Sequence, residues 1–407
     1  MILALWVMVY PTLMALLWMG LASLFVWRRE RPDRWRDVPA EGCSPLPVSI
    51  LIPCFNEGPL LEATLQAALA VAWPDFEVIA INDGSCDNTG STLNGLAEQD
   101  SRLRVVHLAS NQGKALALRA GALVAKHEWL ICIDADALLD RHAVAWMMRH
   151  VLHNPRLGAV TGNPRIRDRS TLLGRIKVGE FSMIIGLIKR AQAMLGGLFC
   201  VSGVIGCFRR WALHAVGYWS SECLTEDIAL TWSLQRAGWQ VLYEPHALVW
   251  ILMPETWAGL WKQRLRWAEG GLQVLGQNLD LLLRPRQWRL LPLLLEPLLS
   301  LVWAYGLGLL LLVQLTQLGQ ATPWPWGGQP LLQIALLVCV LQFALSFWFD
   351  RPYDRGLGRV AFWMIWYPLV FWLVTWLASI LAFPRLLLRP RQQRARWISP
   401  DRGRWQS

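Results

Sequence analysis

Charged residues are scarce in this chain of 407 residues. They make up 17% of it, whereas apolar residues make up 54% and the mean hydropathy is +0.32. This composition excludes an intrinsically disordered chain, and it also excludes a protein built only of soluble globular domains. Tyrosine is scarce too, with 6 residues against 26 tryptophans, and tryptophan is enriched where membranes meet water. The composition therefore predicts an integral membrane protein with room for one sizeable aqueous domain.

Closely spaced cysteine pairs are missing as well. None of the eight cysteines forms a C-x-x-C pair. The sequence therefore predicts neither a zinc site nor a small disulfide scaffold. We interpret these cysteines as reduced thiols of a cytosolic domain.

The net charge of +10 is concentrated in a few places. Residues 38–283 hold 21 basic and 22 acidic side chains, so the excess lies outside them. It occurs in basic clusters beside apolar runs, at residues 28–36, 284–289, 351–359 and from 385 onward. Such clusters mark the cytoplasmic ends of membrane spans and contact anionic lipid headgroups. Nucleic-acid binding is therefore not expected.

Four apolar stretches are candidates for membrane spans. Residues 2–27 are uncharged and precede the first basic cluster, which is the reverse of the order in a cleaved signal peptide. They predict an anchor with its N-terminus outside. The other stretches are residues 291–318, 331–349 and 361–383, and the Pro-, Trp- and Gly-rich residues 323–328 predict a turn between the first two.

The number of spans conflicts with the charge of the tail. If residues 28–290 are cytoplasmic, three further spans place the basic tail outside, against the positive-inside tendency. Either one apolar stretch lies in the interface or re-enters the membrane, or the tail departs from the rule. We favour a cytoplasmic tail. The expected division is an anchor at 1–27, a basic linker at 28–46, an aqueous domain with amphipathic interface helices at 47–283, transmembrane helices at 290–383 and a basic tail at 384–407.

The aqueous domain alternates between strand and helix patterns. Short apolar runs predict strands at 48–53, 76–82, 103–108 and 129–134, with helices at 60–71, 88–98 and 111–126 between them. This alternation predicts an α/β fold with a doubly wound, mostly parallel sheet. Ligands of such sheets bind beyond the carboxyl ends of the strands.

Carboxylates follow three of these predicted strands. Glu57 comes shortly after the first, Asp83 directly after the second, and Asp134 and Asp136 form a D-x-D after the fourth. A D-x-D alone is weak evidence, because a solvated turn also explains it. Together the carboxylates predict a site for a divalent cation, Mg²⁺ or Mn²⁺, with substrate phosphates. Lys114 follows Asn111, which we expect to cap the next helix, and the small number of lysines argues against a mere surface role.

Two later motifs add polar groups. Residues 225–227, Thr-Glu-Asp, open a helical pattern at 228–236, where carboxylates could simply serve the helix dipole. Residues 263–267, Gln-Arg-Leu-Arg-Trp, lie in an amphipathic stretch at 257–273 that could lie on the membrane surface. An arginine there can also clamp a diphosphate, and a tryptophan can stack on a sugar ring.

Taken in order, these motifs resemble the processive family 2 glycosyltransferases, the membrane synthases of cellulose, chitin, hyaluronan and poly-N-acetylglucosamine. The resembling segments are residues 53–57, 82–89, 134–136, 225–227 and 263–267. Within the family, residues 160–167, 184–190, 250–256 and 393–403 resemble those of the bacterial poly-β-1,6-N-acetylglucosamine synthases. The resemblance implies a GT-A-type catalytic domain with transmembrane helices. Family members carry two spans before that domain, whereas this chain has one.

The resemblance also implies roles for individual residues. Glu57 and Asp83 would contact uridine, Lys114 would lie near the diphosphate, Asp134 would hold the nucleotide and Asp136 the metal. Asp227 would be the general base. The remaining roles are diphosphate binding by Gln263 and Arg266, and acceptor binding by Ser202, Gly203 and Trp267.

The implied activity is inverting, processive transfer of N-acetylglucosamine from UDP-GlcNAc into a β-1,6-linked biofilm polysaccharide. The transmembrane helices would form a passage for the polymer across the bacterial inner membrane, with the catalytic domain in the cytoplasm. The implied partners are a small two-span membrane subunit and cyclic di-GMP as activator. The alternatives are a synthase of another β-linked polysaccharide, a lipid-linked sugar transferase, or a transporter or scaffold with a decayed domain. The intact carboxylates argue against the last of these.

The tail repeats one of these motifs. Residues 393–397, Gln-Arg-Ala-Arg-Trp, echo residues 263–267. Either the tail reaches the active site, or the echo reflects the abundance of two residue types that suit a membrane interface. We favour the second interpretation.

Overall fold

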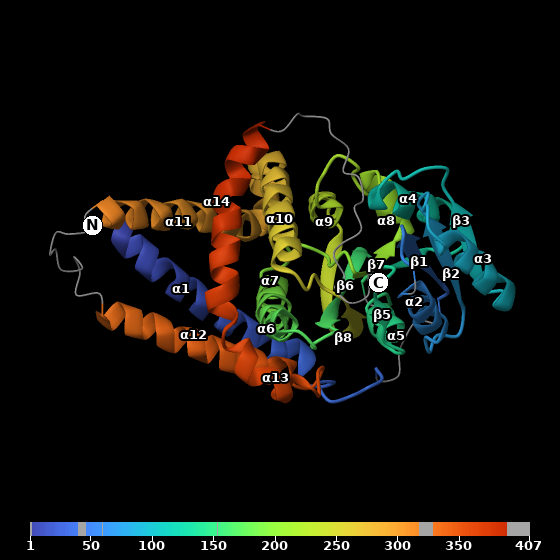
Figure 1. Cartoon of the computed structure of the whole chain (residues 1–407), viewed down its shortest axis with the longest axis horizontal. Coiled ribbons are helices and arrows are strands. Elements are labelled where there is room, and N and C mark those ends of the chain that lie inside the picture. Colours follow the sequence, from blue (N-terminus) through green and yellow to red (C-terminus); the bar gives the residue numbers. More distant parts are fainter. Residues whose placement is uncertain (1, 40–45, 59, 153, 317–328, 389–407) are drawn as a thin grey trace.

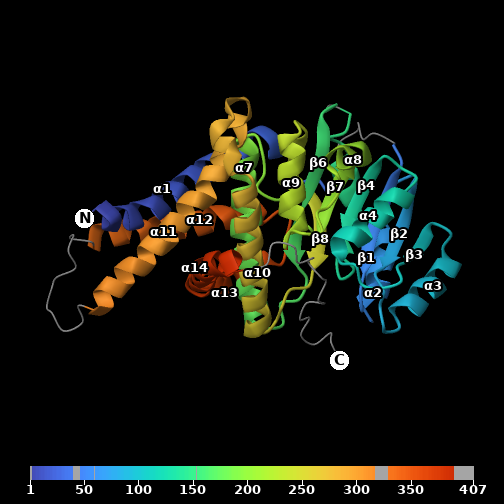
Figure 2. The same ribbon diagram turned by 90° about the horizontal axis from the view of Figure 1, so that it is seen from above.

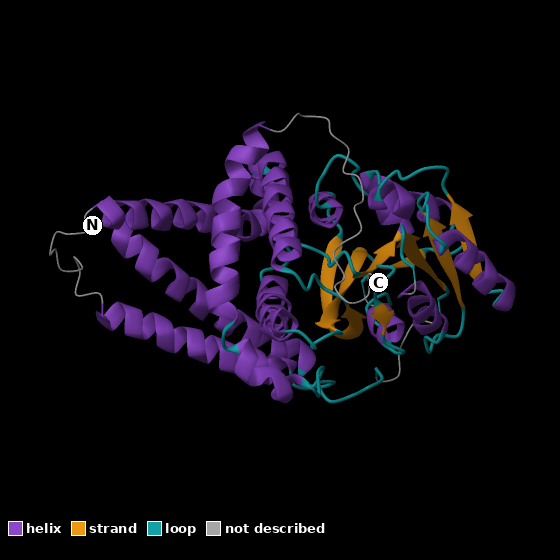
Figure 3. Ribbon diagram, viewed as in Figure 1, coloured by secondary structure: helices purple, strands orange, loops and turns teal. Residues whose placement is uncertain are grey.

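The computed structural model describes residues 2–39, 46–58, 60–152, 154–316 and 329–388. It places an α/β domain at one end of the molecule and long apolar helices at the other (Figure 1). All strands lie within the α/β half (Figure 3). The tail motif at 393–397 and the turn expected at 323–328 fall outside the described residues.

A single sheet of eight strands organises the α/β domain. Its spatial order is β3-β2-β1-β4-β7-β6-β8-β5. The first four of these positions are parallel, as expected, whereas β7 pairs antiparallel with both β4 and β6. The strands are β1 Val48–Cys54, β2 Phe76–Asn82, β3 Leu103–His107, β4 Trp129–Ile133, β5 Leu138–Leu139, β6 Leu157–Ile166, β7 Ile205–Arg209 and β8 Gln240–Ile251.

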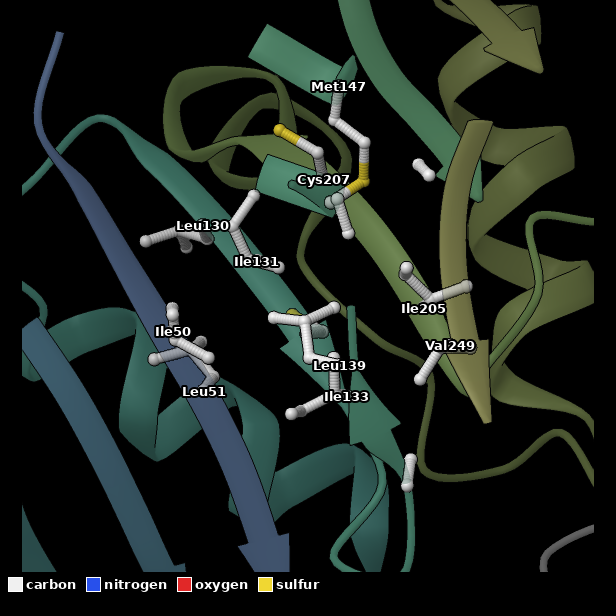
Figure 4. Packing of buried hydrophobic residues seen from close by; sticks show 14 of the residues in the cluster. Ile50, Leu51, Leu130, Ile131, Ile133, Leu139, Met147, Ile205, Cys207 and Val249 are labelled. Atoms are coloured by element: carbon white, nitrogen blue, oxygen red, sulfur yellow. The ribbon is translucent and has the colours of Figure 1, made fainter. Parts of the chain in front are cut away.

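The central strands form the core because they are apolar on both faces. Every residue of β1, β2 and β4 is buried, the pattern of parallel strands that are covered on two sides. Ile50, Leu130, Ile131 and Ile205 pack within this core (Figure 4). Helix α2 lies on one side of the sheet and α4 on the other (Figure 1). The helices of the domain are α2 Leu60–Leu69, α3 Thr89–Gln99, α4 Lys114–Val124, α5 Ala143–Met148, α8 Arg210–Val216 and α9 Glu226–Arg236.

The start of α4 corrects one expectation. The helix begins at Lys114 rather than at Asn111, and Asn111 does not cap it. Gly113 has φ +92°, a left-handed conformation that interrupts the helix and that glycine adopts readily. The Asn111 side chain instead accepts a hydrogen bond from the Gly113 amide at 3.0 Å. The segment before α4 is therefore a shaped loop at the edge of the sheet.

Interface helices separate the sheet from the apolar helices (Figure 2). One is α6 Leu172–Phe181, which continues through a π-helical turn at Ser182–Ile188 into α7 Lys189–Met194. The other is α10 Trp257–Gln277, the amphipathic helix expected from the sequence. Two short 3₁₀ segments, Leu279–Leu283 and Pro285–Leu290, connect α10 to the next apolar helix.

Among the residues that the structure describes, four helices are long and apolar enough to cross a membrane, at residues 2–30, 285–316, 333–350 and 370–388. They contain α1 Ile2–Phe25, α11 Leu291–Thr316, α12 Gln329–Asp350 and α14 Leu373–Leu388. Helix α1 packs against both α11 and α12. Large apolar side chains on their outer faces are exposed, as a lipid-facing surface requires.

The last apolar stretch differs from the single span expected at 361–383. Helix α13 Leu357–Met364 ends first, a π-helical turn follows at Pro368–Trp372, and α14 then begins. Pro368 lacks the amide hydrogen that a continuous helix requires, which explains the break. Helix α14 packs along α10, and it runs across the direction of α1, α11 and α12 (Figure 1). Its direction therefore differs from that of the three other long apolar helices (Figure 1).

A buried ionic cluster connects the α/β domain with the apolar helices. The sequence did not predict it. Arg190 on α7 donates to Glu30 at 2.7 Å and to Asp350 at 3.0 Å, and Arg165 on β6 donates to Asp350 at 2.7 Å. Tyr353 adds a hydrogen bond to Glu30 at 2.7 Å. The Arg190, Glu30 and Asp350 side chains are fully buried. Glu30 belongs to a π-helical segment, Val26–Glu30, that continues α1. The cluster therefore fixes α1 and α12 to the α/β domain and its interface helix.

Candidate active site

Lys114 contacts three of the segments that were predicted to carry site residues. Its ammonium forms an ion pair with the Asp134 carboxylate and donates to the Gly203 carbonyl at 3.0 Å. Its Nζ also lies 3.7 Å from Glu226 Oε1. The start of α4, the end of β4, the loop before β7 and the start of α9 therefore meet at one point. The structure thus brings together residues that the sequence separates by more than a hundred positions.

The positive charge of Lys114 is offset by the carboxylates that it contacts. Burial alone would lower the pKa of Lys114, but the carboxylates of Asp134 and Glu226 hold it above its usual value. Burial raises the pKa of Glu226, and Lys114 opposes that rise. Lys114 therefore remains a cation at physiological pH. A phosphate group entering the site would meet this cation beside Asp134.

Asp227 lies directly beside the loop that carries Ser202 and Gly203. Its Oδ1 accepts from the Ile228 amide at 2.9 Å, which fixes the carboxylate at the start of α9. A β-carbon added to Gly203 would come within 3.0 Å of Asp227 Oδ2. A larger residue at position 203 would therefore crowd this carboxylate. The role of Asp227 as general base stays a prediction.

Asp83 and Glu57 occupy the ends of the first two strands. The Asp83 carboxylate accepts from the backbone amides of Gln112 and Gly113, both at 2.8 Å, and its side chain is buried. It thereby holds the loop that presents Lys114. Glu57 is also buried, and its amide donates to Thr89 Oγ1 at 2.9 Å. Contact of either residue with uridine remains a prediction.

Asp136 lies at the same edge, 7% exposed. Within the described residues, no group of three or more His, Cys, Asp or Glu side chains could enclose a metal ion. Magnesium and similar ions bind nucleotide substrates through one or two carboxylates together with phosphates and water. Such a site fits Asp136, because a cation there would take most of its ligands from the substrate.

The two arginines of the motif at 263–267 do different things. Arg264 is buried, forms an ion pair with Glu180 on α6, and lies 4.6 Å from the Trp267 ring centre and 5.4 Å from that of Phe371. Arg266 is exposed and donates to the Leu224 carbonyl at 3.2 Å, immediately before the Thr-Glu-Asp motif. Arg264 therefore connects the interface helices, whereas Arg266 is available to a ligand.

Gln263 and Trp267, the other polar and aromatic side chains of this motif, are partly buried. Gln263 Oε1 is buried and has no hydrogen-bond partner among the residues that the structure describes. Trp267 is half-buried against Arg264. The sequence did not predict the ion pair between Arg264 and Glu180. An arginine on the apolar side of an amphipathic helix could have indicated a buried acidic partner.

Removing these arginines is expected to have opposite consequences. Arg264→Met leaves the Glu180 charge buried without its partner, a change that costs about 3–5 kcal/mol of stability, so thermal unfolding of the purified protein is expected to shift several degrees lower. Arg266→Ala is expected to leave the melting temperature nearly unchanged and to lower kcat/KM about tenfold, as loss of a charge-assisted contact does. Equal losses of stability in both variants would contradict this division.

Similarity to known proteins agrees with this geometry. The model of the family described as "Glycosyltransferase like family 2" matches residues 45–270. The poly-beta-1,6-N-acetyl-D-glucosamine synthase of Staphylococcus aureus (strain COL) is 35% identical over 98% of both chains, and that of Staphylococcus epidermidis is 36% identical over 97% of both. The solved mannosyltransferase PcManGT from Pyrobaculum calidifontis, in complex with GDP-Man and Mn²⁺, has a TM-score of 0.57 at 22% identity over 88% of this chain and 98% of its own.

The fold is that of a GT-A-type glycosyltransferase, which confirms the predicted fold class. The chain belongs to glycosyltransferase family 2, which confirms the resemblance drawn from the motifs. It is a glycosyltransferase that carries helices able to cross a membrane.

Proposed function

We propose that this enzyme polymerises N-acetylglucosamine from UDP-GlcNAc into β-1,6-linked poly-N-acetylglucosamine. The observation that supports the proposal is the contact of Lys114 with Asp134, Gly203 and Glu226, because residues predicted to bind the donor then lie against the loop predicted to bind the acceptor. The similarity to the staphylococcal synthases extends over nearly the whole of both chains and supports the choice of sugar and polymer.

The chemistry is a single displacement. The 6-hydroxyl of the terminal sugar attacks the anomeric carbon of the donor, the bond from that carbon to the diphosphate oxygen breaks, and UDP leaves. Asp227 receives the hydroxyl proton. Because no covalent intermediate forms, the α-linked donor gives a β-linked product. Lys114 and Arg266 would offset the charge of the leaving diphosphate, and Trp267 would stack on the acceptor.

A divalent cation would complete the donor site. Asp136 would hold it, and Mg²⁺ and Mn²⁺ both accept the carboxylate and phosphate oxygens available there. When bound, the ion neutralises negative charge on the diphosphate. Asp134, already paired with Lys114, would contact the nucleotide instead.

Asp136→Ala is expected to abolish the metal-dependent part of UDP binding, because the diphosphate charge then loses its counter-ion. Titration of UDP onto the purified protein, with and without EDTA, measures this. The unsubstituted enzyme is expected to bind UDP at least tenfold more weakly in EDTA, a difference of about 1.4 kcal/mol. An EDTA effect of the same size in the variant would show that Asp136 does not hold the metal.

The location we propose is a bacterial inner membrane, with the catalytic domain in the cytoplasm. If α1, α11 and α12 cross the membrane and α14 lies in the interface along α10, the tail returns to the cytoplasm. All the basic clusters are then on one side, as the positive-inside tendency requires. The spanning helices would line the passage through which the growing polymer is processively extruded.

We also propose that the complete synthase contains a small two-span membrane subunit and responds to cyclic di-GMP. Three spanning helices are few for a closed passage, so a partner that adds helices fits this arrangement. The isolated chain would accordingly make little polymer.

One experiment tests the proposed reaction. Membranes that contain the chain and its partner are supplied with radiolabelled UDP-GlcNAc, and the product is digested with a β-1,6-specific glycosidase. Labelled polymer that this enzyme degrades is the expected result. Polymer that resists it would indicate a synthase of another linkage, and label recovered in lipid would indicate a lipid-linked sugar transferase.

A further inference from the structure

Lys189 is a buried lysine with no role in the site described above. It begins α7 directly after the π-helical turn, and only 6% of it is exposed. Burying an ammonium group is costly unless hydrogen bonds replace its water. Its partners therefore indicate what it is for.

Those partners are incomplete. Among the residues that the structure describes, the ammonium makes one hydrogen bond, a long one of 3.4 Å to Thr161 Oγ1. A lysine has three N–H donors, so two remain without a protein acceptor. The two other buried cations of the same interface helix differ. Arg190 is paired with two carboxylates, and Lys177 donates to the Pro254 carbonyl.

The position of Lys189 relates it to the acceptor loop. Thr161 Oγ1, which receives the Lys189 hydrogen bond, also accepts from the Ser202 amide at 2.9 Å. Lys114 holds the neighbouring Gly203 carbonyl. The loop is thus held at Gly203 by Lys114 and at Ser202 by Thr161, which also accepts from Lys189.

The Cys200 thiol and the Asp227 carboxylate are the acidic groups near enough to Lys189 to interact with it electrostatically. Burial lowers the pKa of Lys189 to about 8, and these two groups oppose the shift. Burial keeps the Cys200 pKa well above its usual value, so this thiol is neutral. Lys189 is therefore a cation within electrostatic range of the proposed base.

We propose that Lys189 binds the acceptor, and that its two free N–H groups donate to the terminal sugar of the growing chain beside Asp227. This inference rests on the proposed function, and it adds a residue to the acceptor site. Hydroxyl and N-acetyl carbonyl oxygens of a neutral sugar are suitable acceptors. Binding would replace the hydrogen bonds that the buried ammonium lacks, so the sugar is held where its hydroxyl faces Asp227.

The test uses the full chain with its partner in lipid nanodiscs, UDP-GlcNAc as donor and a β-1,6-linked N-acetylglucosamine hexamer as acceptor. Lys189→Met is expected to raise the KM for the hexamer at least tenfold while the KM for UDP-GlcNAc changes less than threefold. Lys177→Met is the matched control, since it removes a buried lysine of the same interface helix and is expected to leave the hexamer KM unchanged. An unchanged hexamer KM in Lys189→Met overturns the proposal.

A second measurement needs no variant. In the unsubstituted enzyme, kcat/KM for the hexamer is expected to fall as the pH rises through about 8, because Lys189 then loses its proton. Of the nearby groups, Lys114 stays charged because its pKa is raised, and Cys200 stays neutral. A flat profile between about pH 7 and 9 contradicts the proposal even if Lys189→Met does not fold. Failure of the unsubstituted enzyme to extend the hexamer would instead overturn the proposed function.

Discussion

Asp227→Asn is expected to lower polymer formation at least a hundredfold while UDP-GlcNAc binding stays within about threefold, since general bases contribute factors of about 10²–10⁴. The amide keeps the shape of the side chain and its place beside Gly203 but accepts no proton. Incorporation of labelled sugar measures the reaction, and titration of UDP-GlcNAc onto the purified variant measures binding.

Glu226→Gln serves as the comparison for this variant. Glu226 is the neighbouring carboxylate and faces Lys114 at 3.7 Å. Its loss is expected to weaken donor binding as well as turnover, because it alters the charge around Lys114. Should UDP-GlcNAc affinity fall in parallel with turnover in Asp227→Asn as well, Asp227 is a binding or structural residue.

Arg190→Met is expected to destabilise the protein by about 3–5 kcal/mol, the usual result of breaking a buried ion pair by removing one partner. Methionine approximates the length of the side chain but leaves the buried carboxylates of Glu30 and Asp350 without this partner. The expected observation is loss of monodisperse protein after extraction in detergent, with a lower melting temperature for what remains.

Arg102→Met is the matched control for Arg190→Met. Arg102 pairs with Asp100 at 2.7 Å, but its side chain is 46% exposed. Exposed pairs contribute about 0–1 kcal/mol, so this variant is expected to melt within a few degrees of the unsubstituted protein. Similar yields and melting temperatures for the two variants would show that the buried cluster does not hold the helices to the catalytic domain.

The parts of the fold that the sequence predicted are those with local signals. Strand β2 was expected at 76–82 and found at Phe76–Asn82, because a short, mostly apolar run between polar turns has few alternatives. Helix α10 followed from its amphipathic period. The start of α4 was missed, because Gly113 adopts a left-handed conformation and its amide donates to Asp83, a residue that follows β2 and is distant in the sequence.

The sequence predicted that the site lies at the ends of the strands, but it did not predict the contacts among the site residues. The parallel order of the strands implied that Glu57, Asp83 and Asp134 share an edge, whereas the role of Asp227 came from the family resemblance. That Lys114 bridges Asp134 and Gly203 depends on the antiparallel insertion of β7, which local patterns do not indicate. The sequence did not predict the burial of Lys189 and Arg264 for a related reason, since each cation is buried by elements that are distant in the sequence.

The buried ionic cluster has a consequence for the order in which the chain matures. Arg165 and Arg190 leave the ribosome 185 and 160 residues before Asp350, with which both pair. Until α12 has been synthesised, neither arginine has this carboxylate as a partner. The final packing of the α/β domain against its interface helix is therefore coupled to the synthesis of α12, so that a nascent chain cannot complete this buried contact until that apolar helix exists.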